Sequence, residues 1–367
     1  MIGPKAVIHL DRLIENYDQI KKKLQVSHLM VVVKANAYGH GSVECAKALE
    51  EHGCESFAVF SITEGIELRD AGIKGDILIF SKLNHSFLDL AIKHNITLNI
   101  SNLDDLDIVK RFSKQHNTSP RFHVKFDTGM TRLGLNVDEA EKAFEILHES
   151  DELNYEGLYS HFATADEGDL SYAYEQVKKF KEILIKADSF GLNFKTIHFS
   201  NSGAVLNLNQ DDFNLVRVGM LVYGAYPSME VPKDISILPV MEFKAPIVEV
   251  RRVKKGTHIS YGGVYKTEKE CNIGVVQCGF ADGIPRPWYK NGFIGYKGKQ
   301  YKIAGRICMD QFMVNFEDDL PREGDEVLIF GSNDLNSILM ETIAEEIEST
   351  PYVIATGIKG RTKLLFS

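Results

Sequence analysis

Short apolar stretches recur along the first 225 residues of the chain, and each ends in a polar residue or a glycine. They predict eight β-strands, at 30–34, 57–61, 76–81, 96–101, 122–127, 155–161, 196–200 and 215–219. Elsewhere apolar residues return every three or four positions beside Lys and Glu, which predicts helices at 42–52, 137–150 and 173–190. Strands that alternate with helices in this number predict an α/β fold, a (β/α)8 barrel.

From about residue 240 the helical pattern fades and shorter alternating runs follow. They predict a helix at 337–348 and strands at 245–251, 272–277, 302–307 and 326–330. We therefore expect a C-terminal, mostly β domain. The domain boundary is placed at 232–239, so that the barrel spans 11–235 while 1–10 pair with 236–367 in the β domain.

Composition narrows the class of partner. The chain has 367 residues, with 51 acidic and 42 basic side chains and a formal net charge of -9. This balance argues against nucleic acid or a membrane surface as a partner and favours a small molecule. No stretch reaches the ~20 apolar residues of a membrane-spanning helix, and the N-terminus lacks a secretory signal pattern, so we expect a cytoplasmic protein. The five cysteines are scattered without a CxxC pair, which is typical of reduced thiols and indicates neither disulfides nor a metal site.

Polar residues close the eight predicted strands. In a (β/α)8 barrel the reactive groups lie at the carboxyl ends of the strands, and the phosphate site usually follows strands seven and eight. The closing residues are Lys34, Ser61, Ser81, Ser101, Asp127, His161, Ser200 and Gly219. The first three serines are common turn formers, and we assign them no chemistry.

Lys34 is the strongest local signal, because an apolar strand delivers it to the barrel mouth. Desolvation lowers the pKa of an ammonium group, and the neutral amine can react with a carbonyl cofactor. A lone lysine here would more simply pair with a carboxylate. The neighbouring Asn36, Tyr38, His40 and two glycines favour the cofactor role instead.

The segment KANAYGHG at 34–41 resembles the cofactor-lysine signature of the alanine racemases. The similarity continues in order through segments at 125–134, 160–166, 201–202, 216–220, 260–262, 281–283, 305–311 and 351–352. The resemblance implies a fold type III enzyme with pyridoxal 5'-phosphate as its cofactor. Such an enzyme interconverts L- and D-alanine for peptidoglycan precursors and is a homodimer with shared active sites.

The resemblance also implies two catalytic bases. Lys34 would hold the cofactor and act as one base at the substrate α-carbon, and Tyr261 would be the other. Racemisation removes a proton on one face and returns it on the opposite face, so two groups must flank the carbon. A phenol needs cationic neighbours to lose its proton usefully, and we expect His161 and Arg217 to supply them.

By the same resemblance Arg217 faces the pyridine nitrogen of the cofactor. Arginine does not give up its proton, so the nitrogen stays largely unprotonated and the ring is a weaker electron sink. A carboxylate in this place would favour decarboxylation or transamination.

The remaining binding roles come from the resemblance as well. The cofactor phosphate is expected at the Ser202 hydroxyl, the amides of Gly219 and Met220, and the phenols of Tyr38 and Tyr352. The substrate carboxylate is expected at Arg132 and at the amide of Met309, which comes with Tyr261 from the partner's β domain. Some relatives carry Lys125 as a carbamate that supports the arginine.

Strict preference for alanine stays open. Asp166, Phe280, Arg286, Arg306 and Thr350 match positions that line the opening to the site, and many relatives have tyrosine at the positions of Phe280 and Ile284. A broader racemase acting on serine or other small amino acids is therefore an alternative. A fold type III decarboxylase and a cofactor-carrying regulatory protein are less favoured, because the first needs an acidic partner for the ring and the second lacks a β domain. The ending at 361–367 departs from the family's usual one and has no role by resemblance.

Overall fold

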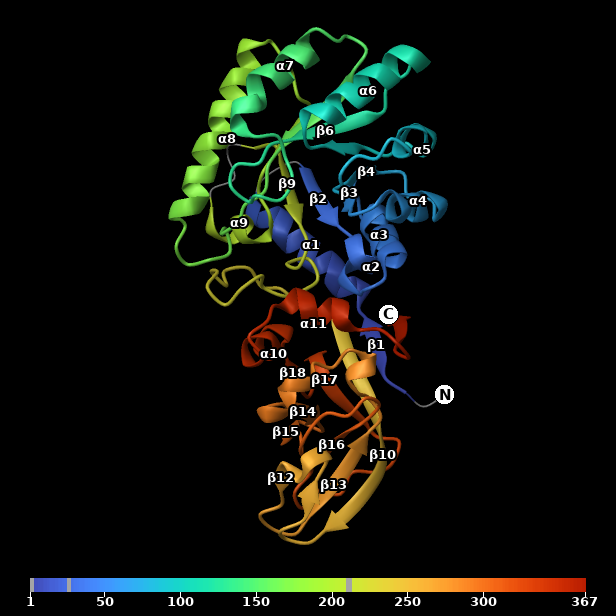
Figure 1. Ribbon diagram of the computed structural model, residues 1–367. Helices are drawn as coiled ribbons and strands as arrows, with labels where there is room; N and C mark the ends of the chain where they lie inside the picture. The colour runs from blue at the N-terminus through green and yellow to red at the C-terminus, as the bar shows by residue number, and fades with distance from the viewer. Residues whose placement is uncertain (1–2, 25–27, 209–212) are drawn as a thin grey trace.

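The protein divides into a helix-wrapped barrel and a β domain, which lie end to end in the computed structural model (Figure 1). The structure describes residues 3–24, 28–208 and 213–367. No helix among these residues is both long enough and apolar enough to cross a bilayer.

The barrel contains eight parallel strands, as the apolar runs predicted. They pair in the order β4-β3-β2-β9-β8-β7-β6-β5, and a parallel bridge from Leu78 to Thr97 joins the two outer strands. Their bounds are β2 His28–Val32, β3 Ser56–Val59, β4 Asp76–Ile79, β5 Leu98–Ile100, β6 Arg121–Lys125, β7 Asn154–Tyr159, β8 Thr196–His198 and β9 Leu215–Val218. The carboxyl ends of all eight therefore meet at one mouth.

Helices cover the outside of the barrel. They are α1 Leu10–Leu24, α3 Ser42–Glu51, α4 Ile62–Asp70, α5 Phe87–Lys93, α6 Leu103–His116, α7 Ala140–His148, α8 Ser171–Ser189 and α9 Ser202–Asn207. Each long helix buries one apolar stripe; α1, for example, buries Leu13 and Ile20. Ser61 accepts a hydrogen bond from the amide of Glu64 and caps α4, which is the structural role that the sequence suggested for it.

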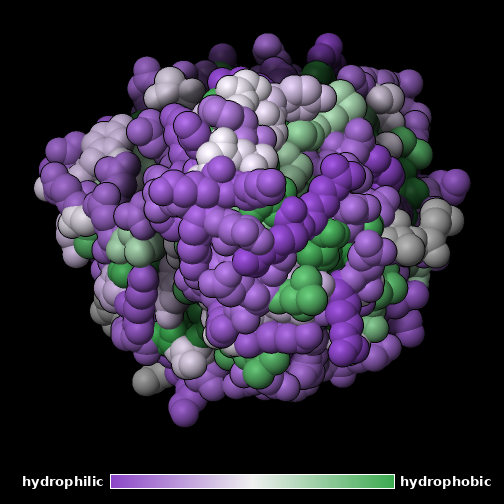
Figure 2. Space-filling view, turned by 90° about the horizontal axis from the view of Figure 1, so that it is seen from below, coloured by the Kyte–Doolittle hydropathy of each residue, from purple (hydrophilic) through white to green (hydrophobic). Residues whose placement is uncertain are grey.

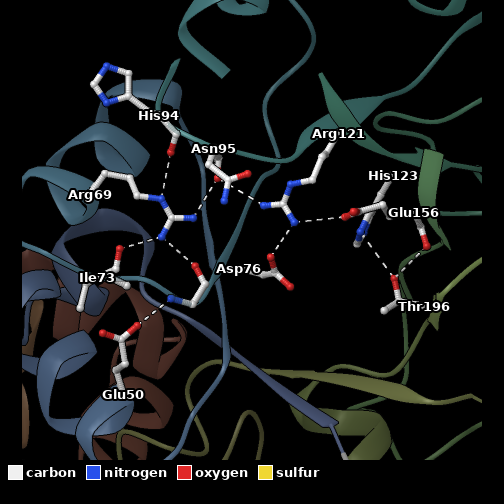
Figure 3. A network of polar contacts seen from close by, with 11 residues as sticks. Glu50, Arg69, Ile73, Asp76, His94, Asn95, Arg121, His123, Glu156 and Thr196 are labelled. Atoms are coloured by element: carbon white, nitrogen blue, oxygen red, sulfur yellow. Dashed lines mark hydrogen bonds and ion pairs between the residues drawn. The ribbon is translucent and has the colours of Figure 1, made fainter. Parts of the chain in front are cut away.

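Two arginines hold the end of the barrel opposite the mouth (Figure 3). Arg121 contacts Asp76 at 2.6 Å and Glu156 at 3.3 Å, and so links β6 to β4 and β7. Arg69 donates to four backbone carbonyls in the turns around β4 and α5. This end is fixed by structural contacts, which leaves the chemistry to the mouth.

The β domain is built on one long strand, β10 Met241–Val253, which pairs with β1, β13 and β17. β1 Lys5–Ile8 lies between β10 and β19 Lys363–Phe366, so both ends of the chain belong to this sheet. The other elements are β11 His258–Ile259, η2 Tyr261–Gly263, β12 Tyr265–Lys266, β13 Cys271–Val276, η3 Phe280–Asp282, η4 Arg286–Lys290, β14 Phe293–Tyr296, β15 Lys299–Lys302, β16 Phe312–Asn315, β17 Glu326–Ser332, β18 Ser337–Ile338, α10 Met340–Glu346 and α11 Pro351–Gly357.

Two local predictions for the β domain were wrong. The predicted strand at 302–307 ends at Lys302, because the strand of this hairpin starts earlier, at Lys299, and pairs with β14. The predicted helix at 337–348 is a short strand followed by α10, and a second helix, α11, follows it. Pro351 begins α11, where its missing N–H costs no hydrogen bond.

Candidate active site

Lys34 opens a left-handed turn at the barrel mouth. Strand β2 ends at Val32, two residues earlier than predicted, and α2 Lys34–Tyr38 follows it. Four consecutive residues from Ala35 to Tyr38 have φ between 50° and 54°. Such a conformation costs about 1–2 kcal/mol per non-glycine residue, so the surrounding structure must enforce it.

Contacts on both sides hold this turn. Glu64 accepts from the amide of Ala35 at 2.8 Å, and the Asn36 side chain accepts from the amide of Ser42 at 2.9 Å. At Gly39, with φ 86°, a Cβ would lie 2.5 Å from the carbonyl oxygen of Ala355 in α11. Lys34 is therefore fixed by contacts from the barrel and from α11 together.

A cavity of about 280 Å³ opens beside Lys34. Eight residues that the sequence assigned to the site line it: Lys34, Tyr38, Arg132, His161, Ser202, Arg217, Gly219 and Tyr352. The others in its lining are Val32, Phe60, Phe80, Lys125, Leu133, Tyr159 and Asn201.

The cavity is strongly cationic. Lys34, Lys125, Arg132 and Arg217 line it, and its described lining contains no carboxylate. Burial, and then the charge of Arg132, lower the pKa of Lys34. The same two causes lower the pKa of Lys125 to about 8. The cavity thus fits a ligand with several negative charges, and it makes the neutral form of both amines more accessible than in a free lysine.

Arg217 is buried and hydrogen-bonded on several sides. Its Nη1 donates to Nδ1 of His198 at 2.7 Å, and its Nη2 lies 3.2 Å from Nδ1 of His161. Nη2 also donates to the carbonyls of Ser160 and Phe199. These contacts fix the guanidinium at the carboxyl ends of β7, β8 and β9.

His161 is not a cationic neighbour, and this part of the sequence prediction was wrong. A guanidinium only donates hydrogen bonds, so Nδ1 of His161 must accept and the ring stays neutral. Burial, and then the charge of Arg217, lower the pKa of His161 well below its ordinary value. The positive charge at this end of the cavity belongs to Arg217.

A buried histidine pair connects Arg217 with the far end of the barrel. His198 accepts from Arg217 at Nδ1, so its Nε2 carries the proton and donates to Nδ1 of His123 at 2.9 Å. His123 then faces the Thr196 hydroxyl at 3.5 Å (Figure 3). Burial lowers the pKa of His123 to about 3, so both rings are neutral and their hydrogen bonds run in one direction.

Polar donors without internal partners gather after β8 and β9. The Ser202 hydroxyl accepts from the amide of Gly219 at 3.1 Å. The buried amide of Met220 finds no acceptor among the residues that the structure describes. Burial raises the pKa of both Tyr38 and Tyr352, so these phenols, with ring centroids 5.6 Å apart, keep their protons for donation. This set of donors fits a phosphate group.

Arg132 extends from a loop that one carboxylate organises. Asp127 accepts from the amides of Gly129, Thr131 and Arg132 at 2.8 to 3.0 Å. Thr131 has φ 55°, a conformation that these hydrogen bonds stabilise. The Arg132 side chain itself is exposed at the cavity, where it can bind a carboxylate.

Tyr261 and Met309 do not line this cavity. They border a shallow depression in the β domain together with Ser260, Gly262, Cys308, Asp310 and Gln311. Tyr261 belongs to η2 between β11 and β12, and β12 lies at the end of the β domain distant from the barrel (Figure 1). The described chain therefore brings together eight predicted site residues but separates both of these from them.

The surface around Tyr261 and Met309 is open to solvent. Their side chains are 67% and 55% exposed. The end of the β domain in Figure 2 shows apolar patches on an otherwise hydrophilic surface. The amide of Met309 has no acceptor within the described residues, so it is available to an external ligand.

Sequence reasoning missed Tyr159 in the cavity wall and the buried His198 that stacks on it. Tyr159 lies with its ring 5.3 Å from Cζ of Arg217 and 5.8 Å from Nζ of Lys125. Its hydroxyl donates to Asn99 at 2.8 Å, which fixes the ring, and His198 stacks on it. The alternation of side chains along a strand could have found Tyr159 and His198, each two residues before a polar strand-end residue.

Of the two positions near the expected opening, only one is exposed. Phe280 is 37% exposed, whereas Ile284 is 2% exposed and packs in the hydrophobic core. A side chain buried in this way does not line an opening. Ile284 is therefore a core residue, and Phe280 is the exposed one of the two positions.

The fold and the cavity define a class of protein: a barrel enzyme in which a strand-end lysine with a lowered pKa faces a cationic cavity with a phosphate-type cradle. Comparison with models of protein families identifies the family within this class. The alanine racemase N-terminal domain matches residues 8–227 and the alanine racemase C-terminal domain matches residues 240–366. The chain belongs to the alanine racemase family.

Individual relatives agree with this placement. The chain is 36% identical to alanine racemase 2 of Caldanaerobacter subterraneus subsp. tengcongensis, over 100% of this chain and 95% of that one. The structure of an alanine racemase from Clostridium difficile 630 has a TM-score of 0.92 at 35% identity and covers 100% of this chain and 96% of its own. An alanine racemase from Bartonella henselae with covalently bound pyridoxal phosphate has the same fold, with a TM-score of 0.90 at 24% identity over 100% of both chains.

Proposed function

We propose that this protein is an alanine racemase that uses pyridoxal 5'-phosphate to interconvert L- and D-alanine. The observation that carries the proposal is the cationic cavity at the barrel mouth, in which Lys34, Arg132 and Arg217 converge and the described lining has no acid. The product would supply peptidoglycan precursors in the cytoplasm, and the five free thiols fit a reducing compartment.

The residues present fit the cofactor. Lys34 would hold it covalently through Nζ, and the phosphate would be bound by Ser202, the free amide of Met220 and the phenols of Tyr38 and Tyr352. At Gly219 a Cβ would lie 2.8 Å from the Tyr38 hydroxyl, so only glycine leaves that donor in place. When bound, the cofactor supplies an electron sink that makes the α-hydrogen of the amino acid more acidic.

Lys34 would act as a base on one face of the substrate. Its lowered pKa allows the neutral amine to take a proton at Nζ in one direction of the reaction, while Tyr261 supplies one on the opposite face, and the protonated amine delivers a proton in the reverse direction. The left-handed turn places the amine within 5.9 Å of the ring centres of Tyr38 and Phe80, whose apolar faces exclude water around it.

Tyr261 would act on the opposite face, supplied by a second copy of the chain. In this proposal the protein is a homodimer, and the exposed surface with Tyr261 and Met309 covers the cavity of the partner. The phenol of Tyr261 and the free amide of Met309 are both exposed on this surface. A dimer interface that completes an active site of the partner needs exposed functional groups of this kind.

Arg132 and the Met309 amide would bind the substrate carboxylate, one from each chain. Arg217 would face the ring of the cofactor with a charge that it does not lose. Because the described lining offers no carboxylate in that place, the cavity favours racemisation over decarboxylation.

One assay tests the proposal directly. The purified protein is incubated with each L-amino acid in deuterated water, and both enantiomers are analysed for α-deuterium by chiral chromatography and mass spectrometry. We expect deuterium in L- and D-alanine. Label in serine at a comparable rate would point to the broader racemase, and CO2 release without D-amino acid would contradict the proposal.

A further inference from the structure

The segment 358–361, which follows α11, packs against residues 281–282 and reaches the turn that carries Met309 through Arg361. Arg361 ends this segment and forms a two-armed contact with Asp282, in which Nε and Nη2 each donate at 3.0 Å. Its Nη1 lies 2.8 Å from Oδ1 of Asp310, the residue next to Met309. One guanidinium thus joins the C-terminal segment to two carboxylates of the β domain.

The two ion pairs differ in strength. The side chain of Asp282 is 1% exposed, whereas those of Arg361 and Asp310 are 54% and 59% exposed. A bidentate pair with a buried carboxylate is well oriented and little screened by solvent. The buried pair therefore anchors the guanidinium, and the exposed arm reaches Asp310 from a fixed point.

The backbone on the other side of Met309 is also held. The amide of Phe280 donates to Cys308 and the amide of Ala281 donates to Met309, at 3.1 and 3.0 Å. At Gly279 a Cβ would lie 2.1 Å from the carbonyl oxygen of Met309, so the two segments are in close contact. Within this turn the amide of Cys308 donates to Gln311, whereas the amides of Met309 and Asp310 find no acceptor among the described residues.

We propose that Arg361 is a positioning residue, which fixes the 308–310 turn so that the Met309 amide keeps one orientation for the substrate carboxylate. The inference rests on the proposed function, in which that amide binds the carboxylate in the partner's cavity. It gives a role to an arginine in the C-terminal segment, where the family resemblance assigned none.

The test compares Arg361→Ala and Arg361→Lys with the wild type. Arg252→Ala is the matched control, because Arg252 also pairs with two acids of the β domain, Glu270 and Asp318, but lies in β10. Steady-state kinetics give KM and kcat for alanine, and hydrogen exchange with mass spectrometry follows the peptide that contains 306–311. Exchange requires no catalysis, so it reports on the turn independently of activity.

We expect Arg361→Ala to raise KM for alanine about tenfold and to change kcat little, because the carboxylate contact is equal in ground and transition states. The peptide should exchange faster in the same variant. Arg361→Lys keeps the charge but not the planar guanidinium, so its KM and its exchange rate should lie between those of the wild type and Arg361→Ala. Millimolar guanidinium added to Arg361→Ala should lower its KM again. Arg252→Ala should match the wild type in all readouts.

Faster exchange with an unchanged KM, or a raised KM with unchanged exchange, would overturn the inference. So would a loss confined to kcat. If the wild type racemises no alanine, the proposed function fails and the substrate part of the inference fails with it, while the exchange data still decide whether Arg361 orders the turn.

Discussion

The barrel mouth and the exposed turns of the β domain carry the two proposed bases under opposite conditions. Lys34 is enclosed in a cationic cavity whose walls are tied by hydrogen bonds to Arg217 and Asp127. Tyr261 protrudes from a short helical turn and shares its depression with backbone and small polar groups. The first region is organised by its own chain, whereas the second offers exposed groups that, in our proposal, a second copy of the chain covers.

The two regions also differ in where the cations that act on each proposed base lie. Burial and neighbouring cations of the same chain lower the pKa of Lys34. For Tyr261 the equivalent cations lie in the cavity of the partner, in our proposal. The comparison predicts that changes in the barrel act on cofactor binding, and that changes in the turns act on substrate binding or turnover while the cofactor stays bound.

The largest effect is expected at Lys34. Lys34→Ala should abolish racemisation and remove the absorbance at about 420 nm that a cofactor joined to a lysine gives. The exposed Lys22→Ala in α1 is the control and should keep both signals. Absorbance that survives in Lys34→Ala would exclude Lys34 as the attachment point.

Tyr261→Phe should leave that absorbance intact and lower racemisation by at least about 10²-fold, the usual scale for a general base. The loss should be unequal between the enantiomers when α-deuterium exchange is measured from each. Tyr265→Phe, four residues away, serves as the control. Equal residual exchange from L- and D-alanine would count against two bases on opposite faces.

Gly219→Ala should weaken cofactor binding about tenfold or more, because the added methyl would displace the Tyr38 hydroxyl from the phosphate cradle. A spectroscopic titration of the cofactor-free protein measures the affinity. Gly3→Ala meets no atom within 4 Å and should bind the cofactor normally. An unchanged affinity in Gly219→Ala would move the phosphate elsewhere.

The smallest expected effect is on stability in acid. Burial lowers the pKa of His123 to about 3 and that of His40 to about 4. Below about pH 6.5 these two histidines take up protons in the unfolded chain, whereas in the folded chain their rings stay neutral. The stability that they contribute is therefore present above about pH 6.5 and is lost as the pH falls. At pH 5, protonation of each of these histidines in the unfolded chain lowers the free energy of unfolding by about 2 kcal/mol. This is because pH 5 lies about 1.5 units below the ordinary histidine pKa, and each unit corresponds to about 1.4 kcal/mol.

Denaturant unfolding at several pH values between 7 and 5 measures the slope of the unfolding free energy against pH. His123→Asn should make the slope shallower by about one proton, whatever its effect on stability at pH 7. The exposed His85→Gln should leave the slope unchanged. A slope in His123→Asn equal to that of the wild type would mean that His123 is protonated in the folded barrel.

The strands of the barrel could be predicted from the sequence because each is a short run of buried apolar residues with a polar end. In the β domain the same reasoning missed β16 and β19, four residues each; β16 mixes buried and half-exposed positions, and β19 is mostly exposed. It also missed α11, whose seven residues show no helical stripe of useful length. Short elements held by tertiary contacts leave little local pattern.

The residues of the site also divide into those that the local sequence pattern predicts and those that it does not. The carboxyl ends of strands identified Lys34, His161 and Gly219 as candidates, whereas Tyr261 depended on family resemblance, since a tyrosine beside two glycines is an ordinary turn. The left-handed turn after Lys34 could not be predicted, because alanine and tyrosine rarely adopt positive φ and even asparagine, which tolerates it better, usually does so as a single residue. Contacts such as that of Glu64 with the amide of Ala35 hold it here. The neutral state of His161 also required the observed contact with Arg217.

The central claim is that one active site takes Lys34 from one chain and Tyr261 from another, and mixing two inactive variants tests it most directly. Lys34→Ala and Tyr261→Phe proteins, each a homodimer with almost no activity, are co-expressed and the hybrid is purified with two affinity tags. Each hybrid dimer should contain one intact site and one doubly altered site, and should recover about half of the wild-type activity per dimer. A hybrid as inactive as its parents would contradict the claim, because it would place both bases in the same chain.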